Sequence, residues 1–448
     1  MRVITNLVFT LMLLLETIAQ QQPTEMTLDD CVKYALENNE LVRISQFDSE
    51  IAEAQVRETT AAGLPQANIN AGINYNFDLQ ENILPARFSD PNAAEGEEIA
   101  IAFGRAYDGN VALSINQLLF DGSYFVGLQA AKTFRELSSK EKIQTEIDIV
   151  EAVNKAYYNA LITVEQLELL DKNIGRLDTL LRETNSMYEA GFAEKVDVDR
   201  IRVNYNNLKV DRSRSAQLQQ ISEKLLKFQM GMDLSQPIIL TESLEAVEVI
   251  VPPIRSNDFD YNQRIEFSQL TTNETLAYLD MKNNKAQYLP KLNLSFGYGW
   301  NTASDDFSQL FIGRRWLDFG ALGLSASIPV FDGFLKSNRI QQNKLQIKQV
   351  QSQMTYLKKS IDLEIEQSRI NLNSQVETLD VQRQNVALAQ EVYDITKMKY
   401  QEGVGSNSEV IDADTSLKEA QTNYLNSLFD AITSEIELKK ALGILYQN

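Results

Sequence analysis

The sequence predicts a mainly α-helical chain that also contains membrane-crossing β-strands, built as two tandem copies of one unit. Motifs recur at a nearly constant spacing, and each copy contains both alternating segments and a very long helical pattern. Gly and Pro number 19 and 9 among 448 residues, together about 6% against a usual frequency of roughly 12%. Because few residues interrupt secondary structure, we expect long uninterrupted elements.

The duplication is visible in four pairs of motifs that occur in the same order. Their offsets are 225, 211, 212 and 212 residues, so the first copy carries 14 extra residues between its first two motifs. We therefore divide the chain into a first copy at residues 20–232, an irregular equatorial linker at 233–261 and a second copy at 262–448. The pairs are Leu64-Pro65 and Leu289-Pro290, Phe120-Asp121-Gly122 and Phe331-Asp332-Gly333, Tyr188 to Gly191 and Tyr400 to Gly403, and Leu226 to Gly231 and Leu438 to Gly443.

Residues 1–19 are typical of a secretory signal peptide. Arg2 precedes the apolar run Leu7 to Leu15, and small residues lead to an expected cleavage after Ala19. A buried N-terminal helix is the alternative interpretation. No later stretch approaches the roughly 18 apolar residues that a membrane-spanning helix needs, so an exported chain that crosses a membrane must do so with strands.

Each copy begins with a helix that ends near the Leu-Pro step, because proline disfavours helix at the residue before it. Apolar and small polar residues then alternate over about ten residues, which is the length and pattern of a tilted outer-membrane strand. A strand of a soluble sandwich is the alternative. The expected helices are Leu28 to Ala62 and Gln263 to Tyr288; the strand hairpins are 66–120 and 291–331, with return strands Val111 to Phe120 and Gly320 to Val330 and hydrophilic outer loops Asp78 to Asp108 and Asn301 to Asp318.

A very long helix follows each Phe-Asp-Gly motif, with Asp121 and Asp332 as expected N-caps. Apolar residues recur every seven positions, which favours packing along neighbouring helices. Each helix would be about 100 Å long and would end at Gly191 or Gly403, where a positive φ can reverse the chain. The expected long helix hairpins are 122–232 and 332–445, with return helices Lys195 to Met230 and Ser408 to Leu442.

Composition excludes several classes of function. The chain has no histidine and one cysteine, Cys31, which removes His-dependent nucleophiles and the usual zinc sites. The 62 acidic against 42 basic residues, a net charge of -20, argue against a nucleic-acid partner. Carboxylate pairs and Ser-Lys arrangements remain as catalytic options, but no carboxylate pair lies in a recognisable motif, so we expect no enzyme, no cofactor and no metal site. We expect Cys31 to be a buried free thiol.

Four strands cannot close a sheet on themselves, and an open strand edge is not tolerated in lipid. The chain must therefore assemble through its strands, and strand physics alone allows two, three or four copies. The order of the motifs, from the Leu-Pro step to the two Tyr-x-x-Gly turns, resembles that of the TolC-like outer-membrane efflux proteins. The resemblance implies a homotrimer with a twelve-stranded barrel in the outer-membrane lipid of a Gram-negative bacterium, continued by a helical tunnel into the periplasm. It also implies a passive exit duct that binds a periplasmic adaptor protein and an inner-membrane pump.

The same resemblance implies roles for the two Tyr-x-x-Gly turns. They correspond to the periplasmic tips that contact the adaptor, here Gly191 with Phe192 and Gly403 with Val404.

A periplasmic gate is implied beside these tips. Glu409 and Asp412 lie six and nine residues beyond Gly403, where the family places a ring of carboxylates that narrows the pore. Asp197 matches the carboxylate that accepts a hydrogen bond from the tip tyrosine, here Tyr400. The arginine of the family's lock falls on Gly405, so that link is missing. Early-turn acids favoured by the helix dipole, and a tyrosine that only fills a crevice, are the alternatives.

The leading functional hypothesis is an outer-membrane duct for small toxic compounds. An exit tunnel for type I protein or peptide secretion has the same architecture, because cargo choice resides mostly in the pump. A soluble coiled-coil structural or adhesive protein would explain the heptads and the acidity but not the alternating strands at equivalent places in both copies.

Overall fold

The computed structural model describes residues 23–244, 249–252, 259–312 and 316–446. The predicted signal peptide, residues 1–19, lies outside the described residues. The described residues form two compact units, a helical unit within Met1–Ser49, Leu137–Thr271 and Ser352–Asn448 and a strand unit within Glu50–Glu136 and Thr272–Gln351. Each unit contains residues from both sequence copies, because the two longest helices contribute to both units. The copies are therefore divisions of the sequence and not separate compact bodies.

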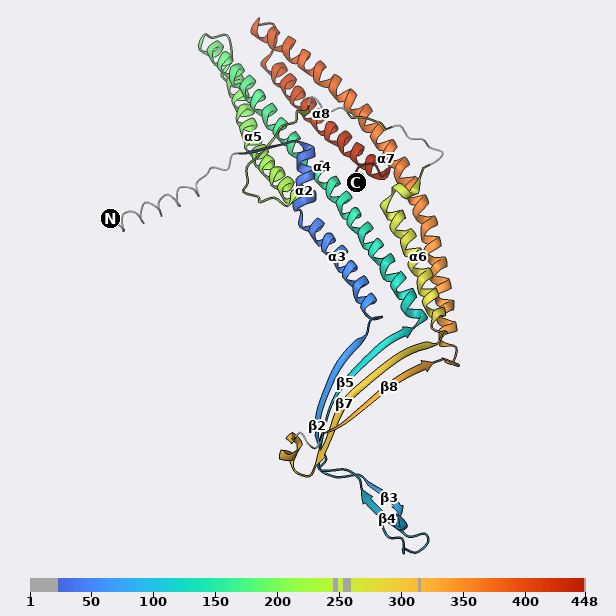
Figure 1. Cartoon of the computed structure of the whole chain (residues 1–448). Coiled ribbons are helices and arrows are strands. Elements are labelled where there is room, and N and C mark those ends of the chain that lie inside the picture. The colour runs from blue at the N-terminus through green and yellow to red at the C-terminus, as the bar shows by residue number, and fades with distance from the viewer. Residues whose placement is uncertain (1–22, 245–248, 253–258, 313–315, 447–448) are drawn as a thin grey trace, which may run out of the picture. The chain divides into compact units, whose positions relative to one another are not determined.

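The strand unit is organised by a four-stranded antiparallel sheet in the order β2-β5-β7-β8 (Figure 1). The two copies meet at its centre, where β5 pairs with β7 and Ile115 lies opposite Phe296. Among the described strands, the outer strands β2 and β8 each pair with a single neighbour. The four strands are β2 (Gln66–Tyr75), β5 (Tyr107–Phe120), β7 (Lys291–Ser304) and β8 (Leu317–Ser327).

The first predicted loop contains structure that the sequence interpretation missed. Within Asp78 to Asp108, β3 (Glu81–Pro85) and β4 (Glu98–Ala102) form an antiparallel hairpin. Ile99 and Ile101 alternate with Glu98, Ala100 and Ala102. This alternation covers only five residues in a segment rich in acids and prolines, so it did not indicate a strand. The second loop is also shorter than expected, since β7 continues to Ser304 and a 3-10 turn follows.

The first predicted helix is two helices. The chain leaves helical geometry at Asn39, with φ -67° and ψ 132°. Its side chain stabilises the break, because Nδ2 donates to the Gln229 carbonyl at 2.8 Å and Oδ1 accepts from the Leu41 N–H at 2.8 Å. The expectation of one helix from Leu28 to Ala62 was wrong because Asn39 has a partner 190 residues away. The helices are α2 (Leu28–Asn38), α3 (Glu40–Ala61) and, in the second copy, α6 (Ile265–Ala286).

The caps of the long helices differ between the copies. Helix α4 (Gly122–Glu189) begins directly after Asp121, whose Oδ1 accepts the Ser123 N–H at 2.7 Å, as predicted. Helix α7 (Leu335–Gln401) begins two residues later than predicted, because Gly333 and Phe334 have positive φ values of 64° and 67°. Asp332 still accepts the Lys336 N–H at 3.1 Å and pairs with its Nζ at 2.8 Å.

The helical unit contains the two hairpins, α4 with α5 (Lys195–Met230) and α7 with α8 (Asn407–Ala441). The predicted heptad positions Val153 and Ala160 are buried in its larger core. A second core lies nearer the hairpin tips and includes Leu177, Ile201 and Leu417. Part of the linker is regular, because β6 (Ile238–Leu240) pairs in parallel with β1 (Thr24–Met26). No helix in the described ranges is long and apolar enough to cross a membrane.

Candidate functional site at the helix-hairpin tips

The first tip is a glycine turn between two helices. Helix α4 ends at Glu189, Gly191 has φ 81°, and α5 begins at Lys195. A capping box closes the start of α5, because Asp197 accepts the Glu194 N–H at 3.3 Å. Phe192 at the apex is 84% exposed, so the tip offers an aromatic side chain that no described part of the chain covers.

The second tip repeats this arrangement. Gly403 has φ 75° and Val404 is 78% exposed. Ser406 caps α8 and exchanges hydrogen bonds with Glu409 at 3.3 and 3.5 Å. A Cβ built on Gly405 would lie 3.1 Å from the Tyr400 nitrogen, which is tighter than most real contacts. Gly405, the position where the resemblance implies an arginine, is therefore packed against the end of α7.

The predicted hydrogen bond from Tyr400 to Asp197 is absent from the described contacts. The Tyr400 hydroxyl donates instead to Thr184 Oγ1 at 3.3 Å, and Thr184 is fully buried on α4. Tyr400 is 8% exposed. The prediction paired the tyrosine with the wrong element, because its ring packs into the core between the hairpins rather than toward the first turn of α5.

Asp197 has a different partner from the second hairpin. Asn407 Nδ2 donates to the Asp197 carbonyl at 2.9 Å and to its carboxylate at 3.2 Å. Arg200, one turn further along α5, donates to Ser408 Oγ at 3.0 Å. Two polar contacts therefore join the first turns of α5 and α8. We refer to Asp197, Arg200, Asn407 and Ser408 as the tip clasp.

The two predicted gate carboxylates, Glu409 and Asp412, are both exposed. Glu409 serves as the third residue of the capping box of α8, which fits the alternative of an early-turn acid. Asp412 has no side-chain hydrogen bond or ion pair with any other described residue. Since one chain does not close a pore, the ring of carboxylates remains a prediction about the assembled protein.

A buried polar cluster lies further from the tips and joins three helices. Arg176 on α4 donates to Asp414 on α8 at 3.4 Å, and its guanidinium lies 5.3 Å from the centre of the Tyr393 ring on α7. Burial raises the pKa of the Asp414 carboxyl, although Arg176 and Lys418 act in the opposite direction. Apart from Asp197, the residues of this cluster and of the tip clasp belong to no sequence motif, so sequence reasoning did not single them out. The same holds for Thr184, which accepts the Tyr400 hydroxyl.

Solved outer-membrane channels share this fold. CusC superimposes with a TM-score of 0.74 at 17% identity, covering 93% of this chain and 91% of that one. VceC of Vibrio cholerae gives 0.70 at 16% identity, with 93% and 96% covered. The Campylobacter jejuni channel CmeC gives 0.73 at 16% identity, with 94% and 86% covered. The predicted fold class, mainly helical with a strand part, is confirmed.

The chain belongs to the outer membrane efflux protein family, whose model matches residues 31–232 and 269–444. The outer membrane protein TolC of Vibrio cholerae is 20% identical over 93% of this chain and 91% of its own length. The toluene efflux pump outer membrane protein TtgC of Pseudomonas putida is 23% identical over 93% and 82%. The predicted resemblance and the predicted outer-membrane location are confirmed.

Proposed function

We propose that three copies of this chain form a passive exit duct for small toxic compounds in the outer membrane. In this proposal an inner-membrane pump delivers the compounds through a periplasmic adaptor protein. Membership of the outer membrane efflux protein family supports outward transport. The unpaired edges of the four-stranded sheet support assembly of several chains.

The two sheet edges carry the proposal. β2 and β8 each pair on one side only, and unpaired backbone groups in hydrocarbon cost several kcal/mol each. Pairing β8 of one copy with β2 of the next removes both edges, and three copies give a closed sheet of twelve strands. Apolar side chains such as Ile69 and Leu322, 74% and 73% exposed in the single chain, would then face lipid.

The hairpin tips are the proposed periplasmic mouth. Phe192 and Val404 are exposed at the two apices and would contact the adaptor. The tip clasp would hold α5 against α8 in the resting duct. Three copies of Glu409 and Asp412 would place six carboxylates around the mouth and favour cations there.

Gene deletion tests the proposal. We expect the deletion strain to become more sensitive to drugs and detergents, with its secreted proteins unchanged, and the intact gene to restore resistance. A normal resistance profile together with loss of a secreted protein or peptide would instead identify a secretion tunnel. Replacing both Glu409 and Asp412 by Ala should reduce cation selectivity in single-channel recordings; unchanged selectivity would contradict the carboxylate ring.

A further inference from the structure

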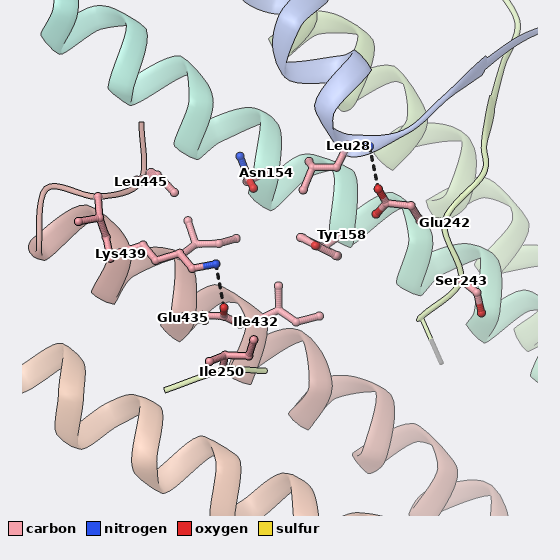
Figure 2. Close-up of a pocket in the computed structure, with 12 residues that line it drawn as sticks. Leu28, Asn154, Tyr158, Glu242, Ser243, Ile250, Ile432, Glu435, Lys439 and Leu445 are labelled. Atoms are coloured by element: carbon pink, nitrogen blue, oxygen red, sulfur yellow. Dashed lines mark hydrogen bonds and ion pairs between the residues drawn. The ribbon is translucent and has the colours of Figure 1, made fainter. Parts of the chain in front are cut away.

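A pocket of about 580 Å³ lies in the helical unit (Figure 2). Its volume is within the usual range for small-molecule sites. Helices α4 and α8, the start of α2, and the residues Glu242, Ser243 and Ile250 contribute to its walls. Half of its twelve lining residues are aliphatic, namely Leu28, Ile250, Ile432, Ile436, Ile444 and Leu445.

The charged groups of this pocket are unequally paired. Glu435 pairs with Lys439 at 2.8 Å along the same helix, so its charge is largely compensated. The Glu242 carboxylate accepts the Leu28 N–H at 3.1 Å and forms no other hydrogen bond or ion pair with a described residue. The pocket therefore contains one carboxylate whose charge has no cation.

Tyr158 lies between these carboxylates on α4 (Figure 2). Burial, followed by the charges of Glu242, Glu435 and Asp29, raises the pKa of Tyr158 to about 12. The neutral phenol therefore remains at physiological pH, and its surroundings are negative. An aromatic ring beside an uncompensated carboxylate is the combination that attracts organic ammonium groups.

We propose that this pocket binds a monovalent organic cation with an apolar body, such as an aryl- or alkylammonium compound. The ammonium group would lie between Glu242 and the Tyr158 ring, and the apolar body would contact Ile250, Ile432 and Leu445. An anion would be repelled by Glu242, and the one lining ammonium, Lys439, is already paired with Glu435. A hard metal ion requires several oxygen ligands, and the described residues contain no group of three acidic, His or Cys side chains placed to hold one. The proposal goes beyond the duct function and does not depend on transport.

Three probes of nearly equal shape but different charge test whether the pocket prefers a cation. Binding of 1-naphthylmethylamine, 1-naphthalenemethanol and 1-naphthoate to the full chain in amphipol is measured by fluorescence anisotropy at pH 7. We expect the ammonium compound to bind tightest, the alcohol more weakly and the carboxylate weakest. Equal affinities for the three probes would overturn the proposal.

Two substitutions locate the site. Glu242→Gln keeps an acceptor for the Leu28 N–H but removes the charge, so we expect the ammonium probe to bind about tenfold more weakly or worse and the alcohol to bind as before. Ile250→Trp, at a position 59% exposed, should fill the pocket and weaken binding of both probes. Glu391→Gln, an exposed carboxylate on α7 outside the pocket, is the control and should change neither. Unchanged ammonium binding in Glu242→Gln would place the cation elsewhere and contradict the proposal.

Discussion

Single side chains at the tips show how a shared motif can acquire different partners. Tyr400 and Asp197 occupy the positions that the family motif leads one to expect, yet each contacts a third residue: Thr184 for the tyrosine and Asn407 for the aspartate. The motif describes the turn, whereas the partner depends on how the two hairpins face one another.

A double-mutant cycle distinguishes these contacts from the expected lock. Because Tyr400 and Asp197 donate to and accept from different residues among those described, Tyr400→Phe and Asp197→Ala should be additive within about 0.5 kcal/mol. Tyr400→Phe alone should cost about 1 kcal/mol, the net value of a hydrogen bond. Hydrogen exchange at the ends of α4 and α7 measures both effects. A coupling energy above about 1 kcal/mol would indicate that Tyr400 and Asp197 interact directly.

The buried aspartate predicts a specific pH dependence. The raised pKa of Asp414 means that the folded protein disfavours the ionised carboxyl, so this residue's contribution to stability is present at low pH and is lost as the pH rises through the raised pKa. In Asp414→Asn the charge is absent at every pH. We therefore expect the variant to gain stability relative to the native protein as the pH rises from about 4 to 7.

Thermal unfolding followed by circular dichroism measures this difference. Arg176→Met should behave in the opposite way, because it leaves an ionised Asp414 without its partner at neutral pH, at a cost of about 3 kcal/mol that diminishes at low pH. If the stability difference between Asp414→Asn and the native protein does not change with pH, the pKa of the Asp414 carboxyl is not raised in the folded protein.

At the scale of elements, two glycines with similar φ values have different surroundings. Gly231 ends α5 with φ 69°, and a Cβ there would lie 2.7 Å from the Asn38 carbonyl oxygen. Gly191 has φ 81° at the first tip, with nothing within 4 Å. Gly231 therefore permits both a turn and the close approach of α2 to α5, whereas Gly191 permits a turn only.

Alanine substitutions separate the two roles. Gly191→Ala should cost only the left-handed backbone strain, about 1–2 kcal/mol. Gly231→Ala should cost clearly more, because backbone atoms of α2 must also move. Thermal unfolding by circular dichroism gives the comparison. Equal costs would mean that α2 accommodates the methyl group freely.

The sheet edges belong to the scale of the whole molecule. Asn70 in β2 and Ser325 in β8 lie on the small-polar faces of the two edge strands. In the proposed trimer β2 of one copy neighbours β8 of the next, so cysteines on this face can join different chains. Cys31 does not interfere, since it is fully buried and burial raises the pKa of its thiol to about 12.

We therefore expect covalent trimers from oxidised Asn70→Cys chains that carry a second cysteine at position 321, 323 or 325 of β8. Three positions in β8 are tested because the pairing register between β8 of one chain and β2 of the next is not known in advance. Ser114→Cys alone, in the central strand β5, is the control and should give no linked chains, because both neighbours of β5 are in the same chain. Gel electrophoresis without reductant reads the result; linked pairs or long ladders in place of trimers would contradict threefold closure.

Much of the fold was predictable because it depends on short-range chemistry. The seven-residue period, the scarcity of Gly and Pro, and the alternation in β2, β5, β7 and β8 each specify an element from neighbours in sequence. The turn glycines were predictable for the same reason, since the positive φ at Gly191 and Gly403 is a local backbone requirement.

The sequence by itself determined the long helices, the four strands of the main sheet, the glycine turns at the tips and the resemblance to the family. Only the tertiary structure decided that Asn39 breaks the first helix, that Thr184 accepts the Tyr400 hydroxyl, and that Glu242 pairs with no cation among the described residues. These contacts join residues that are far apart in the chain, and they depend on how each helix is rotated against its neighbour. A rotation of one helical position changes the partner without changing the periodic pattern, so no local pattern could specify them.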